Sequence, residues 1–151
     1  MNKATRLAAA CLGGYAGLVG IEHGIFEIMQ GSQPTGGLMI NAILVVNNLR
    51  DIKTDRNSGK RTLAVMIGEH NTRWEYAFLL AGAYAIPAFL WLGDFASAWL
   101  LLPLATLPLA FWQVRLIRQP SDGPALNHLL AKTVKLAFFY SVLLAIGLIL
   151  S

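Results

Sequence analysis

The sequence predicts an all-α bundle of membrane-spanning helices with about five spans. The first observation is composition: of 151 residues, 56% are hydrophobic and only 13% are charged, which is too apolar for an ordinary soluble domain. The second is the distribution of charge, because the basic residues fall in short segments between long apolar runs. A nucleic-acid-binding protein would instead present a basic face with exposed aromatic residues. We therefore expect a multi-pass protein in a lipid bilayer and no nucleic-acid partner.

The N-terminal apolar, glycine-rich run follows Lys3 and Arg6 and predicts a first helix over about residues 4–29. A cleaved signal peptide is the alternative interpretation. No clear small-residue cleavage site precedes the polar residues that end this run, so we favour an uncleaved helix. The segment 31–37, which contains Pro34, is expected to form a turn.

Three polar residues, Glu22, His23 and Glu27, interrupt the N-terminal apolar segment. His23 and Glu27 are four residues apart and share a helix face. They form either a metal or proton site or the headgroup end of the first helix. We favour the second interpretation.

The second apolar run, residues 37–49, would cover about 20 Å as a helix, less than the roughly 30 Å hydrocarbon core of a bilayer. A connection along the membrane surface is expected over 64–72. Longer apolar runs predict the remaining spans, separated by a tight turn at 93–94 and a polar loop at 115–130. These spans are 74–92, 95–114 and 131–151.

The basic segments 1–6, 50–61 and 115–135 alternate along the chain with two connections, 31–37 and 93–94, that carry no basic residue. With five spans and the N-terminus inside, every basic segment lies in the cytoplasm, as the positive-inside rule requires. Tryptophans near the span ends fit the aromatic belts of membrane proteins. They are Trp74, Trp91, Trp99 and Trp112. We expect a bacterial inner-membrane protein.

The only dense polar block follows the second apolar run directly and reads NNLRDIKTDRNSGKRTL over residues 47–63. On a helix, Asn47, Asp51 and Asp55 stack on one face. Two carboxylates one turn apart repel each other unless a cation lies between them, and oxygen ligands of this kind suit Mg²⁺ shared with substrate phosphates. Lys60 and Arg61 follow in a glycine-containing turn and are placed to neutralise the same phosphates.

Two other interpretations of this block carry less weight. A carboxylate pair on a soluble helix is usually a solvated face, but this pair ends an apolar helix beside a basic turn. The segment 59–62 suggests a phosphate-binding nucleotide loop, but that motif requires a glycine five residues before Gly59, where Thr54 stands. The sequence therefore predicts a cation–phosphate site.

Residues 42–151 resemble the C-terminal half of the intramembrane aromatic prenyltransferases. The block over 47–63 is similar to the second aspartate-rich motif of one branch of that family, the 1,4-dihydroxy-2-naphthoate polyprenyltransferases of menaquinone biosynthesis. The resemblance implies a partial prenyltransferase fold. It also implies transfer of a polyprenyl group from its diphosphate to 1,4-dihydroxy-2-naphthoate.

The resemblance assigns roles to seven residues of the block. Asp51 and Asp55 would be the catalytic residues and would bind Mg²⁺ that bridges to the polyprenyl diphosphate. The substrate-binding side chains would be Asn47 and Asn48, which complete a polar wall, together with Arg50, Lys60 and Arg61, which hold the leaving diphosphate.

Residues 1–41 do not resemble the family and contain no aspartate, whereas the family carries a first aspartate-rich motif in its N-terminal half. We therefore expect two regions, a membrane helix of other origin over 1–41 and the prenyltransferase-like region over 42–151. Such a chain would be a fusion or a truncation with half the metal site. It would act with a complementary half or as a homo-oligomer. The alternative is a non-catalytic small membrane protein that retains a diphosphate–Mg²⁺ binding surface.

Overall fold

A computed structural model describes residues 34–94, 96–119 and 122–150, and the structural statements below concern these residues. Within these ranges the chain is helical and contains no strand, which confirms the all-α prediction. The elements are α3 (Pro34–Asn57), α4 (Leu63–Leu92), the 3₁₀ helix η1 (Ala98–Thr106), α5 (Leu107–Ile117) and α6 (Gly123–Leu150). The predicted first helix, with Glu22, His23 and Glu27, lies outside the described residues.

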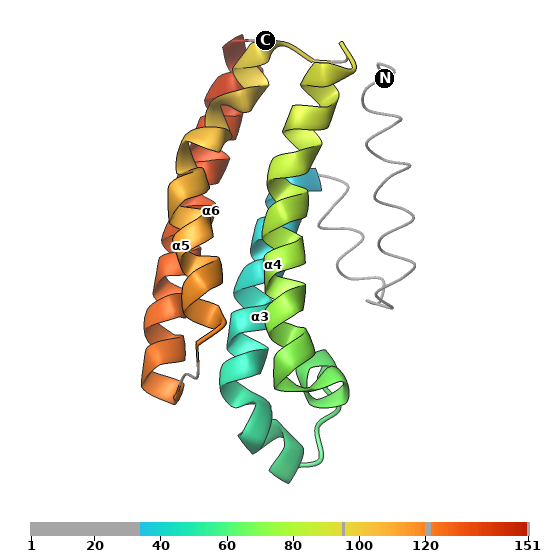
Figure 1. Ribbon diagram of the computed structural model, residues 1–151, viewed down its shortest axis with the longest axis vertical. Helices are drawn as coiled ribbons and strands as arrows, with labels where there is room; N and C mark the ends of the chain where they lie inside the picture. Colours follow the sequence, from blue (N-terminus) through green and yellow to red (C-terminus); the bar gives the residue numbers. More distant parts are fainter. Residues whose placement is uncertain (1–33, 95, 120–121, 151) are drawn as a thin grey trace.

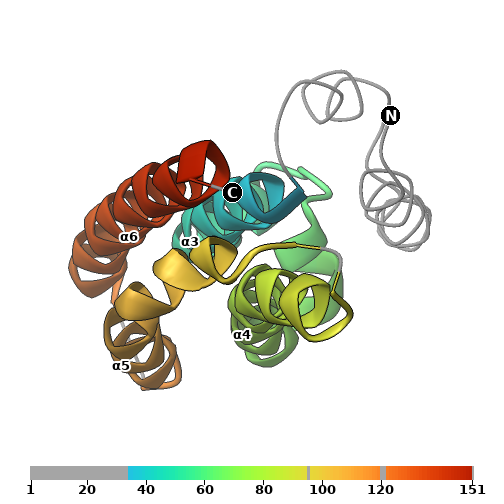
Figure 2. The ribbon, with the colours of Figure 1, turned by 90° about the horizontal axis from the view of Figure 1, so that it is seen from above.

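Successive helices run up and down along one long axis (Figure 1). Seen along that axis, α3 lies between α4 and α6, while α5 packs beside α6 (Figure 2). The 3₁₀ helix η1 lies at the end of the bundle opposite the C-terminal end of α3. The end of α3, the turn into α4 and the beginning of α6 are therefore gathered at one end of the molecule.

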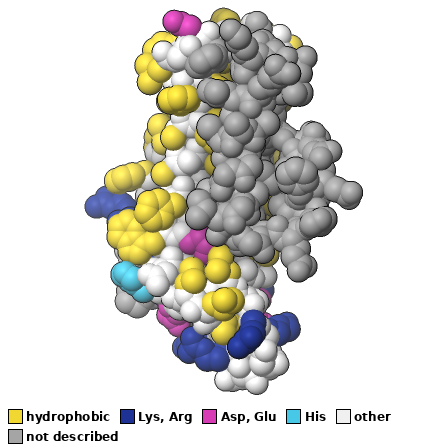
Figure 3. All heavy atoms as spheres, turned by 90° about the vertical axis from the view of Figure 1, so that its right-hand side faces the viewer, with side chains coloured by type: hydrophobic (Ala, Val, Ile, Leu, Met, Phe, Trp, Pro, Cys, Tyr) yellow, Lys and Arg dark blue, Asp and Glu magenta, His cyan; other side chains and the backbone are white. Residues whose placement is uncertain are grey.

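Within the described residues, three segments are long and apolar enough to cross a membrane: Leu63–Leu92, Ala98–Ile117 and Gly123–Leu150. They confirm the prediction of a multi-pass membrane helix bundle. The helix α3 is not among them, because its last third is polar. Lys and Arg side chains gather at the end of the molecule where α3 terminates, and hydrophobic side chains are prominent above them in the part of this view that is not grey (Figure 3).

The predicted turn over 31–37 is wrong in its described part, because residues 34–37 are helical. The predicted surface connection over 64–72 is helical with a break at Gly68. The helix α3 already begins at Pro34, since a proline at the first helical position loses no hydrogen bond that the helix needs. The helix α4 begins at Leu63, where the Thr62 side chain accepts a hydrogen bond from the backbone N–H of Val65. It then breaks at Gly68, which has a φ of 82°.

The predicted polar loop over 115–130 is also too long. The helix α5 continues to Ile117 and α6 begins at Gly123. Asp122 caps α6, because its side chain accepts a hydrogen bond of 3.0 Å from the backbone N–H of Ala125 and so satisfies a donor of the first turn. The connection is therefore short, and residues 123–130 form the polar first turns of α6.

The core of the bundle combines apolar packing with a buried, fully paired polar group. The Tyr76 hydroxyl of α4 donates to Oε1 of Gln113 on α5 at 2.9 Å and lies 2.9 Å from the hydroxyl of Thr133 on α6. Gln113 in turn donates to the backbone oxygen of Lys132. Because all three side chains are buried and paired, they fix the relative positions of α4, α5 and α6 without a desolvation penalty.

Candidate functional site

The polar end of α3 terminates in a turn that brings the chain back toward its own helix. Gly59 has a φ of 73°, a left-handed conformation that glycine adopts without steric cost. The backbone N–H of Lys60 donates to the oxygen of Asp55, and that of Gly59 donates to the oxygen of Arg56. These two hydrogen bonds form a Schellman motif. The turn therefore returns the Lys60 side chain toward the carboxylates of α3.

Asp55 and Lys60 form an ion pair at this turn. The Nζ atom of Lys60 lies 3.4 Å from Oδ1 of Asp55. The Asp55 side chain is 11% exposed, whereas the Lys60 side chain is 68% exposed. A nearly buried carboxylate requires a nearby cation or donor to offset its desolvation. Lys60 supplies that charge while its ammonium group stays accessible to a ligand.

Arg50 and Asp51 form the second ion pair of the site, and its geometry is bidentate. The Nε atom of Arg50 donates to Oδ1 of Asp51 at 2.7 Å, and Nη2 donates to Oδ2 at 2.7 Å. Nη2 also donates to Oδ1 of Asn47, one turn earlier, at 2.8 Å. Parallel hydrogen bonds of this kind are stronger than single ones. Both side chains stay partly exposed, with 27% and 36% of their surface accessible.

Arg50 also reaches across to α6. Its Nη1 atom donates to Oδ1 of Asn127 at 3.0 Å. Asn127 lies in the second turn of α6, and 77 residues separate it from Arg50 in the chain. The guanidinium is therefore held at three points, by two side chains of its own helix and by one from another helix.

The charges of the site act on one another. The Arg50 guanidinium, which donates to both oxygens of Asp51, holds the pKa of that carboxyl below its usual value of 3.8. Partial burial opposes this effect, and the positive charge of Lys60 adds to it. Lys60 therefore lies within electrostatic range of both carboxylates, and Asp51 is ionised at neutral pH.

The structure brings together five of the seven predicted site residues and leaves two aside. The five are Asn47, Arg50, Asp51, Asp55 and Lys60. Asn48 is half-buried next to Asn47, and Arg61 is exposed in the turn before α4. Among the described residues, no hydrogen bond or ion pair joins either of them to the cluster.

Comparison with known proteins places this cluster in a family. Residues 34–143, almost three quarters of the chain, match the UbiA prenyltransferase family. The chain belongs to this family. The match begins at the start of α3 and ends within α6, so it contains all the residues of the cluster, including Asn127. The resemblance inferred from the block over 47–63 is thereby confirmed.

The relatives of this UbiA-family chain include enzymes from bacteria and related proteins from animals. It is 40% identical over 115 residues to the 1,4-dihydroxy-2-naphthoate octaprenyltransferase of Escherichia coli, which covers 76% of this chain and 37% of the relative. It is 38% identical over 97 residues to the enzyme of that name in Mycobacterium leprae, covering 64% and 32%. The Drosophila melanogaster UbiA prenyltransferase domain-containing protein 1 homolog is 39% identical over 111 residues, covering 73% and 29%.

The chain spans about a third of the length of these curated relatives. No solved structure matches it.

The cluster fits a hard cation in its donor chemistry. Asp51 and Asp55 supply carboxylate oxygens one turn apart, the ligand type that Mg²⁺ takes in proteins. The described part of the chain contains no group of three or more His, Cys, Asp and Glu side chains that would enclose a metal. Two carboxylates suit Mg²⁺ because it usually keeps waters and shares substrate phosphates. Each carboxylate already faces a basic side chain, so a cation and these side chains compete for the same oxygens.

Asn127 is the site residue that the sequence analysis missed. Its position was assigned to a polar loop, and no pattern in the sequence connects it with a residue on α3. The only feature that could have pointed to Asn127 is its polar amide beside the start of a long apolar helix. Polar amides are common in such connections, so this feature is not specific. Only the packing of α6 against α3 shows that it meets Arg50.

Proposed function

We propose that this chain forms part of a membrane prenyltransferase that transfers a polyprenyl group from its diphosphate to 1,4-dihydroxy-2-naphthoate in menaquinone biosynthesis. The observation that carries the proposal is the cluster of two carboxylates and two basic side chains at the polar end of α3, beside three helices apolar enough to span a membrane. Four of the relatives bear the name 1,4-dihydroxy-2-naphthoate octaprenyltransferase, which supports the choice of acceptor.

In this proposal the carboxylates and the basic residues have separate tasks. Asp51 and Asp55 would hold Mg²⁺, which when bound neutralises charge on the diphosphate. Lys60 and Arg50 donate to the diphosphate oxygens and stabilise the negative charge that grows as the carbon–oxygen bond to the prenyl group breaks. Asn47 orients Arg50, while Asn48 would complete the polar wall and Arg61 would help to hold the leaving diphosphate. The prenyl carbon then bonds to the electron-rich aromatic ring, which loses CO₂.

The apolar helices have a task of their own in the reaction. The bond cleavage leaves an allylic cation, which water would quench. Apolar side chains are exposed on the membrane-facing part of the bundle. Among them are Ile40 and Leu44 on α3, which are 56% and 44% exposed. They offer the prenyl tail an apolar surface directly above Asn47 and Asp51.

The basic residues around the site also support an orientation in the membrane. Lys53, Arg56, Lys60 and Arg61 lie at the site end, whereas the connection at the other end carries Asp94 and no basic residue. By the positive-inside rule, the site would face the cytoplasm of a bacterium from the inner membrane.

A partner is part of the proposal, because the described part of the cluster offers only two carboxylates to a metal. A complementary segment or a second copy would supply the remaining metal ligands. The competing function is a non-catalytic membrane protein that binds Mg²⁺–diphosphate. It rests on the small donor set among the described residues.

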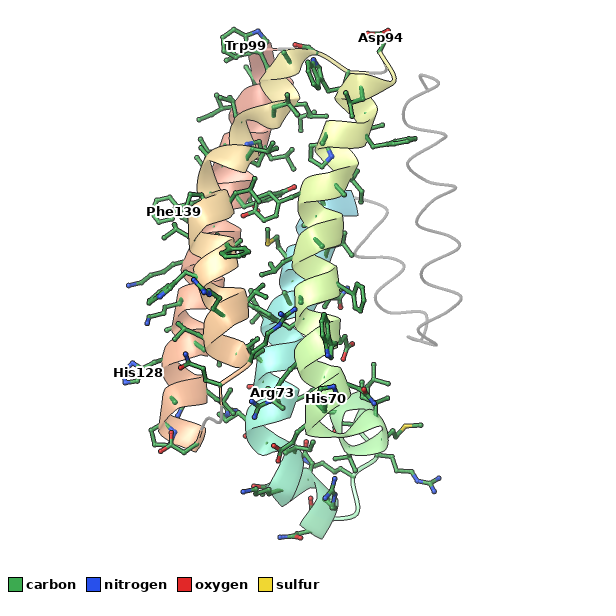
Figure 4. The ribbon with its side chains drawn as sticks, viewed as in Figure 1. His70, Arg73, Asp94, Trp99, His128 and Phe139 are labelled. Atoms are coloured by element: carbon green, nitrogen blue, oxygen red, sulfur yellow. The ribbon has the colours of Figure 1, made fainter. Side chains whose placement is uncertain are left out.

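The test is prenyl transfer by the purified chain in lipid nanodiscs, with Mg²⁺, a polyprenyl diphosphate and 1,4-dihydroxy-2-naphthoate. The matched variants are Asp51→Asn in the cluster and Asp94→Asn at the opposite end of the bundle (Figure 4). Asp94 has a φ of 56°, which asparagine also tolerates. We expect product with the wild type and Asp94→Asn, and a fall of about 10²-fold or more with Asp51→Asn.

Three outcomes separate the alternatives. Product that disappears with Asp51→Asn supports the prenyltransferase. Absence of product, together with Mg²⁺-dependent binding of the diphosphate that Asp51→Asn removes, supports the non-catalytic binding protein. Neither product nor diphosphate binding would refute both.

A further inference from the structure

We propose that Arg50 is exchanged between Asp51 and the bound diphosphate, and that Asn127 is the positioning residue that keeps Arg50 at the site during the exchange. This inference rests on the proposed function, because it takes a metal-bound diphosphate as the ligand.

The resting state is defined by the bidentate pair. Arg50 donates twice to Asp51, at 2.7 Å each. A divalent cation on the same carboxylate would stand beside the guanidinium and repel it. The diphosphate that accompanies the cation attracts the guanidinium, because planar Arg forks bind phosphate oxygens as well as they bind carboxylates. Arg50 is therefore displaced from Asp51 by the metal and taken up by the diphosphate.

Asn127 differs from Asp51 in a way that matters for this exchange. Its side-chain oxygen is a neutral acceptor, 3.0 Å from Nη1 of Arg50. A divalent metal ion binds a neutral amide oxygen more weakly than it binds a carboxylate. Nη1 is also the one nitrogen of the guanidinium with no bond to Asp51. The Asn127 contact therefore does not have to break when the pair with Asp51 breaks.

The location of Asn127 gives the contact a further consequence. Asn47 holds Arg50 from its own helix, but Asn127 holds it from α6. Without Asn127, a displaced Arg50 is tied only to α3 and is free to turn toward water. With it, the guanidinium stays in the space between α3 and α6 and loses less conformational freedom when the diphosphate arrives.

The experiment measures two ligands separately on the full chain in lipid nanodiscs. Inorganic pyrophosphate in the presence of Mg²⁺ is followed by titration calorimetry, and Mn²⁺ alone is followed by the spin-resonance signal of the free ion. The variants are Asn127→Leu, which removes the acceptor at similar size, Asn127→Gln, which keeps an amide oxygen, and Arg50→Leu. The control is His128→Ala, because His128 is exposed on the outer side of α6 (Figure 4).

We expect Arg50→Leu to bind Mn²⁺ more tightly than the wild type, because its competitor for Asp51 is gone, and to bind pyrophosphate about tenfold more weakly. We expect Asn127→Leu to weaken pyrophosphate binding about three- to tenfold, because the variant loses a single charge-assisted hydrogen bond at a partly exposed site. Mn²⁺ binding by this variant stays unchanged, Asn127→Gln restores most of the pyrophosphate affinity, and His128→Ala behaves as the wild type. A variant that had merely lost its structure would bind both ligands less well.

Pyrophosphate binding that is equal in the wild type and in Asn127→Leu would overturn the role of Asn127. Weaker binding of Mn²⁺ by Arg50→Leu would overturn the exchange. A wild-type chain that binds no Mg²⁺–pyrophosphate would refute the proposed function itself, so the two failures are distinguishable.

Discussion

The contact between α6 and η1 is predicted to depend on the absence of a side chain at Gly147. A Cβ added at this position would collide with the carbonyl oxygen of Trp99 and would lie 3.0 Å from its carbonyl carbon and 3.4 Å from Cα of Leu100. All three are backbone atoms of η1, which cannot rotate away as a side chain does. Small residues at helix contacts let backbones approach closely in membrane proteins. Gly147→Ala therefore forces α6 and η1 apart.

The size of the effect follows from a comparison of two glycines. Gly82, in α4, would place its Cβ 3.3 Å from Cδ1 of Leu38, the end of a flexible side chain. Alanine in a helix interior is favoured over glycine by up to about 1 kcal/mol, so Gly82→Ala is expected to be neutral or stabilising. Gly147→Ala gains the same helix propensity, but overpacking destabilises it by about 1–3 kcal/mol or more, because only the backbone can move away.

The assay is thermal unfolding of the two variants and the wild type, followed by circular dichroism in one detergent. For a chain of this size, 1 kcal/mol corresponds to a shift in Tm of about 2–4 °C. We expect Gly147→Ala to melt several degrees below Gly82→Ala. If the two variants melt at the same temperature, α6 and η1 do not approach as closely as the structure has them, and the reasoning fails.

Three further predictions concern the core, the turn and the ion pair. Tyr76→Phe removes one of two donors to the buried Gln113 oxygen, which still accepts from Thr133, and is expected to lower the free energy of unfolding by about 0.5–1.5 kcal/mol; an unchanged Tm in a detergent melt would contradict it. Gly59→Ala strains the left-handed turn by about 1–2 kcal/mol and moves Lys60 away from the carboxylates, so calorimetry should show weaker Mg²⁺–pyrophosphate binding; equal affinity would show that the turn does not place Lys60. The pKa of Asp51 is lower in the folded state, so its pair with Arg50 stabilises the fold above the usual pKa of 3.8 and ceases to do so as pH falls through the lowered value. The Tm difference between wild type and Asp51→Asn should therefore be present at pH 7 and vanish in strong acid; the same difference at both pH values would refute the assignment.

The sequence by itself determined the class of the protein and which polar side chains of α3 share one face. Long apolar runs with few charges leave the chain no soluble fold, and the helical spacing of Asn47, Asp51 and Asp55 puts them on one side of α3. Glycine at 59 permits a left-handed turn that other residues adopt only at a steric cost, and this turn brings Lys60 back to Asp55. Local rules decide all of these features, because they depend on residues within one or two helical turns of each other.

Only the tertiary structure decided what local rules leave open. Asn127 joins the site because α6 packs beside α3, and no short-range pattern reports a contact between residues that lie 77 positions apart. The same limit explains why the core contact between Tyr76 and Gln113 was not foreseen. The mispredicted connections have a local cause, because Pro34 and Asp122 start helices as readily as they mark turns. Packing resolves that choice, since the apolar faces of α3 and α6 gain their stability only when the helices extend far enough to be buried against each other.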